Sequence, residues 1–199
     1  MPAERLVAAV AAGLTILGEN RVQEAEAKVA TVGGATWHLI GPLQSNKAKR
    51  ALATFALIES VDTVELAERL DRLAAEHRPG GRVPVLLQVN VDDDPAKAGF
   101  SPDGLVAALP RLAGLEHLEL GGLMTVGRLV ERAEDARPTF AALRTLSERL
   151  RGSDAGGAGR SGLGPALSMG MTSDYPIAVE EGATIVRVGR ALFGERHHH

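Results

Sequence analysis

The chain has 199 residues, of which 45% are hydrophobic and 24% are charged, as is typical of one globular domain. A net charge of −3 and a pI of about 6.1 argue against a nucleic-acid partner, and the absence of cysteine excludes disulfides and thiolate metal sites. No apolar run approaches the length of a membrane span, and the start, Met1–Arg5, lacks a signal-peptide pattern. The sequence therefore predicts a cytoplasmic protein without a membrane partner.

The first half of the chain alternates helix-like and strand-like segments. Helical periodicity predicts helices at 2–13, 22–29 and 45–54, and short apolar runs predict strands at 14–17, 36–40 and 56–60. Asp62 and Glu65 form a D-x-x-E signature, which predicts that a further helix starts at Asp62. Arg78-Pro79-Gly80-Gly81 is expected to end it.

The second half continues the same alternation. Residues 83–91 are almost continuously apolar, as expected of a strand buried on both faces. Ser101 and Pro102 have the residue types of a helix cap and a first helical position. The remaining expected elements are strands at 118–123, 166–168 and 183–188 and helices at 133–150 and 174–181. The stretch 152–164 is rich in glycine and serine and is interpreted as a mobile loop.

Strands that alternate with helices predict parallel βαβ units. The segments above contain seven strands, whereas a closed (β/α)8 barrel needs eight, and the chain starts on a helix. We therefore expect an α/β protein with a TIM-type (β/α)8 barrel that lacks its first strand, open between the strands at 14–17 and 183–188. An open doubly wound sheet is the alternative. A single barrel domain is expected over 1–196, and 197–199 is interpreted as the remnant of an affinity tag.

Two segments near the C-terminus have residue types suited to binding a phosphate. Ser168–Asp174 lies between a strand and a helix, where its glycine, its hydroxyls and the helix N-terminus can all face an anion. Arg187–Arg190 follows the last strand. In TIM barrels a phosphate site is often built by the loops after strands seven and eight, so the two segments together predict such a site. The alternative is that the small residues only satisfy turn geometry.

Other polar residues fall at or near the carboxyl ends of strands, where barrel active sites lie, but each can equally be a turn or cap residue. They are Gly18-Glu19-Asn20, Gln88 with Asn90, and Met124-Thr125. His38 is interpreted as a packed strand histidine rather than an acid–base group. The histidines outside the tag are too scattered to suggest a metal site.

Several motifs occur in an order that matches one known family. Gly18–Glu24 resembles its G-E-N-x-x-Q-E motif, and Trp37–Lys47 resembles its W-H-x-I-G-x-L-Q-x-N-K motif. Further matches are Leu123-Met124-Thr125, Leu167–Thr172, and Arg187-Val188-Gly189 followed by Phe193-Gly194. The chain thus resembles, as far as Arg196, the pyridoxal-phosphate homeostasis protein family, which is similar in fold to the N-terminal barrel of alanine racemase.

The resemblance implies a site for pyridoxal phosphate (PLP). Ser168 and the backbone around Met169 and Gly170, with Gly189 and the amide of Arg190, would hold the phosphate, and a free phosphate or sulfate ion would fit the same place. Arg187 would face the pyridine nitrogen and Asn20 would lie near the ring. The implied function is that of a non-catalytic carrier or buffer of PLP, a monomer or weak dimer whose protein partners are PLP-dependent enzymes.

The sequence departs from the family at the lysine that binds PLP covalently. In the family this Schiff-base lysine lies on the first barrel strand, in a V-S-K-T-K-P-like segment, and this chain starts at Met1-Pro2, where that segment would be ending. None of the four lysines, Lys28, Lys47, Lys49 and Lys97, matches its position. We therefore expect weak or non-covalent binding of PLP.

Two alternatives remain at this point. One is a PLP-dependent amino-acid racemase, although the similar enzyme needs a second domain and a catalytic tyrosine, and the only tyrosine here is Tyr175. The other is a barrel that no longer holds the cofactor.

Overall fold

The strands form one parallel sheet in simple chain order. The computed structural model describes residues 1–152 and 162–194. Its seven strands pair in the order β1 to β7, each parallel to the next. They are β1 (Ile16–Glu19), β2 (Thr36–Leu39), β3 (Leu57–Val61), β4 (Val83–Gln88), β5 (Leu118–Met124), β6 (Ala166–Met171) and β7 (Ile185–Arg187). A doubly wound sheet would reverse its strand order, so the expected seven-stranded TIM-type barrel is confirmed.

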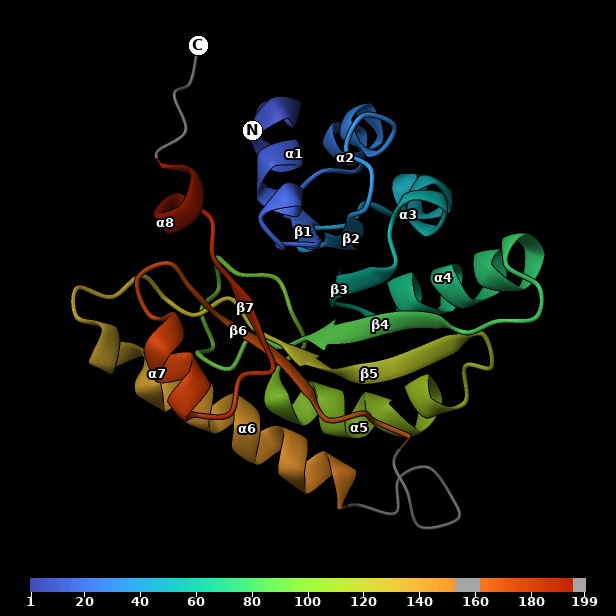
Figure 1. Cartoon of the computed structure of the whole chain (residues 1–199). Helices are drawn as coiled ribbons and strands as arrows, with labels where there is room; N and C mark the ends of the chain where they lie inside the picture. Colours follow the sequence, from blue (N-terminus) through green and yellow to red (C-terminus); the bar gives the residue numbers. More distant parts are fainter. Residues whose placement is uncertain (153–161, 195–199) are drawn as a thin grey trace.

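Helices surround the strands on the outside (Figure 1). They are α1 (Ala3–Ala11), α2 (Val22–Val29), η1 (Ser45–Lys47), α3 (Ala48–Thr54), α4 (Val64–His77), α5 (Pro102–Ala113), η2 (Ala133–Ala136), α6 (Arg137–Arg151), α7 (Tyr175–Glu180) and α8 (Arg190–Phe193). Each long helix turns an apolar stripe towards the sheet, and Leu70, Leu109 and Phe140 are almost completely buried there. The core therefore lies between the helices and the strands.

The bounds of several strands differ from the sequence prediction. The strand expected at 83–91 ends at Gln88 because the following segment doubles back. There the Phe100 N–H donates to the Gln88 carbonyl (2.8 Å) and the Asn90 N–H donates to the Phe100 carbonyl (2.9 Å). The strand expected at 14–17 lies at Ile16–Glu19, and the one expected at 166–168 continues to Met171. Residues expected in turns, Gly18 and Gly170 among them, thus belong to strands.

The helix starts were predicted with mixed success. The prediction of Asp62 as the cap of α4 was wrong, because the Thr63 hydroxyl accepts the hydrogen bond from the Leu66 N–H (3.1 Å). Ser101 caps α5 as expected and accepts from the Gly104 N–H (3.1 Å). The expected mobile loop at 152–164 falls mainly on residues 153–161, outside the described part of the chain, and so does the tag remnant.

The barrel is open between β1 and β7. In the part of the chain that the structure describes, no strand pairing joins these two strands. Their helices nevertheless meet, since Arg5 Nη1 in α1 donates to the Phe193 carbonyl in α8 (2.9 Å). Ile16 in β1 is 62% exposed, although it is an apolar strand residue. The expected gap is therefore present, with a free strand edge on each side.

Candidate functional site

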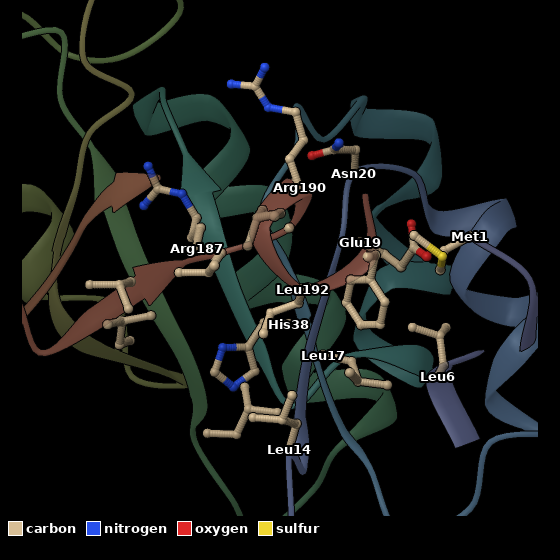
Figure 2. Close-up of a pocket in the computed structure, with 18 of the residues that line it drawn as sticks. Met1, Leu6, Leu14, Leu17, Glu19, Asn20, His38, Arg187, Arg190 and Leu192 are labelled. Carbon is tan, nitrogen blue, oxygen red and sulfur yellow. The ribbon is translucent and has the colours of Figure 1, made fainter. Parts of the chain in front are cut away.

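A cavity of about 600 Å³ lies on the open side of the barrel (Figure 2). Its walls are mainly apolar and come from both sides of the gap, with Leu6 and Leu17 from α1 and β1 and Leu192 from α8. Its polar lining includes His38 and Arg187, which β2 and β7 carry into the barrel interior. An apolar cavity with a few convergent polar groups has the character of a small-molecule site.

The cavity also reaches a buried carboxylate, Glu59, in the middle of β3. Only 1% of Glu59 is exposed. Its Oε1 lies 2.8 Å from His38 Nδ1, and its Oε2 accepts a hydrogen bond from Ser168 Oγ at 2.6 Å. Glu59 therefore links β2 to β6 across the interior of the barrel.

Arg187 extends the same network. Its Nη1 donates to Ser168 Oγ (2.6 Å) and its Nη2 donates to the Thr125 carbonyl (2.7 Å). Burial lowers the pKa of the Arg187 guanidinium, and the nearby carboxylates of Glu59 and Asp174 act in the opposite direction. The network thus holds a desolvated cation beside a buried anion.

The first predicted phosphate segment differs from its expected geometry. Met169 and Gly170 lie inside β6 and are buried, and Ser168 donates its single hydroxyl proton to Glu59. Gly170 has a φ of +88°, and a Cβ there would lie 2.5 Å from the Ala178 Cβ. The glycine therefore serves the close packing of α7 on β6. The N-terminus of α7 also carries the carboxylate of Asp174, which accepts a hydrogen bond from the Met171 N–H (2.6 Å).

The end of this segment meets the second predicted phosphate segment. Thr172 Oγ1 accepts a hydrogen bond from the Gly189 N–H at 3.3 Å. Gly189 lines the cavity, and a Cβ added to it would meet no atom within 4 Å. A backbone N–H, a hydroxyl and open space thus coincide at this place, as a phosphate site requires.

Of the residues expected to bind the cofactor, four line this one cavity: Asn20, Arg187, Gly189 and Arg190. Asn20 and Arg190 are exposed at its mouth. The other three, Ser168, Met169 and Gly170, do not line it. Ser168 reaches it only through its bonds to Glu59 and Arg187.

Sequence reasoning missed Glu59 and gave His38 only a packing role. His38 is indeed buried, at 8% exposure, but its ring lines the cavity. The signal for Glu59 was available, because a carboxylate at the centre of a buried strand requires buried partners. Nothing local indicates that those partners are His38 and Ser168, which lie 21 and 109 residues away.

The other strand-end candidates have structural roles. Gln88 donates to the Ala98 carbonyl (2.9 Å), and Asn90 donates to the Asp94 carbonyl (2.8 Å), so both tie down the loop after β4. Thr125 donates to the Val89 carbonyl (2.7 Å). In residues 1–152 and 162–194, no three His, Asp or Glu side chains form a group that could hold a metal ion. No helix in these ranges is long and apolar enough to cross a membrane.

The lysines do not form the cavity wall, although Lys28 pairs with Glu19, which does line the cavity. Among the described residues no lysine lines it. Lys47 and Lys49 belong to η1 and α3, after β2. Lysine side chains are usually solvated, but two of the four are not. Lys28 is largely buried in an ion pair with Glu19, and the buried Nζ of Lys97 lies between two aspartates, 3.5 and 3.6 Å from their oxygens.

Comparison with known proteins identifies the family. The model of the alanine racemase N-terminal domain matches residues 2–197. The pyridoxal phosphate homeostasis protein of Aquifex aeolicus is 39% identical over 186 residues, which cover 92% of this chain and 78% of the relative. The chain belongs to the pyridoxal phosphate homeostasis protein family. The Pseudomonas aeruginosa member is 40% identical over 200 residues, covering 98% of this chain and 80% of the relative.

A solved structure allows the fold of this family to be compared directly. PipY of Synechococcus elongatus, solved with PLP bound, is 44% identical, with a TM-score of 0.85 over 97% of this chain and 88% of PipY. The curated family members are named for homeostasis of PLP. The resemblance found in the motifs is therefore confirmed at the level of the family and of the fold.

Proposed function

We propose that this protein binds PLP in the cavity between β1 and β7 and acts as a carrier or buffer of the cofactor. The observation that carries the proposal is that Asn20, from the start of the chain, lines one cavity together with Arg187, Gly189 and Arg190 from its end. Family membership and the PLP-bound PipY structure support the choice of ligand. PLP-dependent enzymes are the proposed recipients.

The phosphate of PLP would be held where Thr172 meets Gly189. The Gly189 N–H, now directed at Thr172 Oγ1, can donate to a phosphate oxygen, and the Thr172 hydroxyl can donate to another. The open space beside Gly189 leaves room for the phosphate group, whereas any larger residue would occupy it. Arg190, whose backbone follows directly, adds positive charge at the mouth.

The ring of PLP would lie against the apolar walls, with Arg187 towards its nitrogen. When bound, PLP supplies an aldehyde and an electron-withdrawing ring. A guanidinium at the ring nitrogen disfavours protonation of that nitrogen, which weakens electron withdrawal. Since Arg187 already donates to Ser168 and Thr125, its position is fixed before the ligand arrives.

Holding PLP, rather than catalysis on it, is the activity we propose. No lysine among the described residues lines the cavity, so PLP would bind this chain without a covalent link. Tyr175 lines the cavity but is 39% exposed, and its hydroxyl forms no hydrogen bond with the polar network of the described residues. The curated relatives are named as homeostasis proteins, which also favours a carrier over a racemase.

The test is a titration of the purified chain with PLP. Trp37, the single tryptophan, lines the cavity, so its fluorescence should be quenched as PLP binds. Thr172→Val should weaken binding of PLP and of inorganic phosphate about tenfold or more, the effect of losing one hydrogen bond to a charged group. Thr54→Val is the matched control, because Thr54 bonds only within α3. Absence of saturable quenching in the unmodified protein would refute the proposal.

A further inference from the structure

The buried pair of His38 and Glu59 fixes which ring nitrogen of His38 carries a proton. Glu59 as a carboxylate can only accept hydrogen bonds, and it accepts one from Ser168 Oγ through its Oε2. The 2.8 Å contact between its Oε1 and His38 Nδ1 is therefore an Nδ1–H donor bond. A neutral His38 in this position must leave its Nε2 unprotonated.

The Nε2 atom is free to meet a ligand. Among residues 1–152 and 162–194, no group forms a hydrogen bond with His38 Nε2, and the ring lines the cavity. In the described chain, only Lys97 Nζ and Ser147 Oγ are buried side-chain polar atoms without a hydrogen-bond partner. His38 Nε2, which also has no partner, is therefore not buried and is accessible from the cavity. A lone pair that faces an otherwise mostly apolar cavity is a specific acceptor for a proton donor on the ligand.

We propose that Glu59 is a positioning residue that holds His38 as the Nδ1–H tautomer, and that His38 Nε2 accepts a hydrogen bond from an acidic hydroxyl on the ring of the ligand. The pocket would thereby select hydroxylated pyridines over pyridines that lack the hydroxyl. The selectivity rests on the proposed function for the identity of the ligand, whereas the tautomer follows from this chain alone.

The other histidine–carboxylate pairs of the described chain lack this geometry. His117 Nδ1 lies 3.5 Å from Asp71 Oδ2, and His77 Nε2 lies 3.6 Å from Glu76 Oε2, and both rings are more than one-third exposed. Long, solvated contacts of this kind do not fix a tautomer. His77 and His117 therefore serve as internal references in one spectrum.

The first measurement is ¹⁵N NMR of the histidine rings in the ligand-free protein, at a pH where the rings are neutral. We expect a pyrrole-type signal for Nδ1 and a pyridine-type signal for Nε2 of His38, the reverse of the pattern that free histidine prefers. Glu59→Met removes both acceptor oxygens at similar volume and should return His38 towards the free pattern. Glu76→Met is the matched control and should leave His38 unchanged. A pyrrole-type Nε2 in the unmodified protein would overturn the assignment, whether or not the variant folds.

The second measurement adds ligand to the same sample. PLP should shift the Nε2 signal of His38 but not the signals of His77 or His117, and inorganic phosphate should leave all three in place. A PLP analogue without the ring hydroxyl should bind about three- to tenfold more weakly, the range expected for one hydrogen bond. If PLP saturates the Trp37 signal while His38 stays unchanged, the contact is refuted and the carrier function stands. If PLP fails to bind at all, the carrier function is refuted and the tautomer result is still decided by the first measurement.

Discussion

Replacement of Gly170 by alanine tests whether the glycine in the S-M-G-M-T segment serves the fold rather than a ligand. Its φ of +88° is strained for a residue with a side chain, and such strain costs about 1–3 kcal/mol. The new Cβ would lie 2.5 Å from the Ala178 Cβ and 3.0 Å from the Tyr175 Cα, and overpacking of this kind costs about 1–3 kcal/mol more. We expect Gly170→Ala to lower the free energy of unfolding by roughly 2–6 kcal/mol in total.

Gly80 supplies the matched control for the backbone contribution. Its φ is +89°, but a Cβ there would meet no atom within 4 Å. Gly80→Ala therefore carries the strain without the collision, and the difference between the two variants measures the packing of α7 against β6. Urea unfolding followed by Trp37 fluorescence reports both values, because Trp37 is 4% exposed in the folded protein. Equal losses in the two variants would refute the packing argument.

Three further predictions concern attachment, acid stability and the open edge. Borohydride treatment with PLP, followed by peptide mass analysis, should find no stoichiometric pyridoxyl adduct on any of the four lysines, and an adduct on one of them would reveal a relocated anchor. Burial acts to raise the pKa of Asp92, but hydrogen bonds from Thr139 and from the Arg128 N–H lower it below its usual value. The ionised Asp92 therefore stabilises the folded protein above the pKa that Asp92 has in the unfolded chain, about 4, and this stabilisation is lost as the pH falls through its lower pKa in the folded protein. The difference in free energy of unfolding between the unmodified protein and Thr139→Val should consequently shrink in acid. Fusion of an extended V-S-K-T-K-P segment ahead of Met1 should raise the thermal midpoint by pairing with the free edges of β1 and β7, and an unchanged midpoint would count against strand addition.

The sequence was sufficient for the architecture because local patterns determine it. Seven apolar runs separated by helical stretches predict seven parallel strands, and the structure pairs these strands in chain order. Boundaries were less certain where tertiary contacts decide them. The strand β4 ends at Gln88 because Phe100 returns to pair beside it, and no pattern within 83–91 indicates that return. Asp62 and Thr63 are both good cap residues, and only the observed bond to Leu66 distinguishes them.

The lining of the cavity was predictable as far as the motifs extend along the chain. Arg187 and Gly189 follow the last strand and reach the cavity as the barrel geometry requires. The roles of Ser168 and Gly170 were not readable, because each depends on a residue from another element, Glu59 in one case and Ala178 in the other. A motif specifies the residue types at a strand end. Which residue each of them contacts depends on how the strands and helices pack together in the barrel.

The network around Glu59 also bears on where an anion can bind. The Ser168 hydroxyl accepts a hydrogen bond from Arg187 and donates one to Glu59. A phosphate bound at Ser168 would therefore have to replace the Glu59 carboxylate, whose negative charge already offsets the buried Arg187 guanidinium. Displacing that carboxylate from the network would leave a buried charge uncompensated, which is strongly unfavourable. At Thr172 and Gly189 the donors are half-buried or exposed, and no carboxylate in residues 1–152 or 162–194 accepts from them. The hydroxyls of this segment therefore differ: Ser168 bonds to the arginine within the barrel, whereas Thr172 lies at the place that we propose for the phosphate of the ligand.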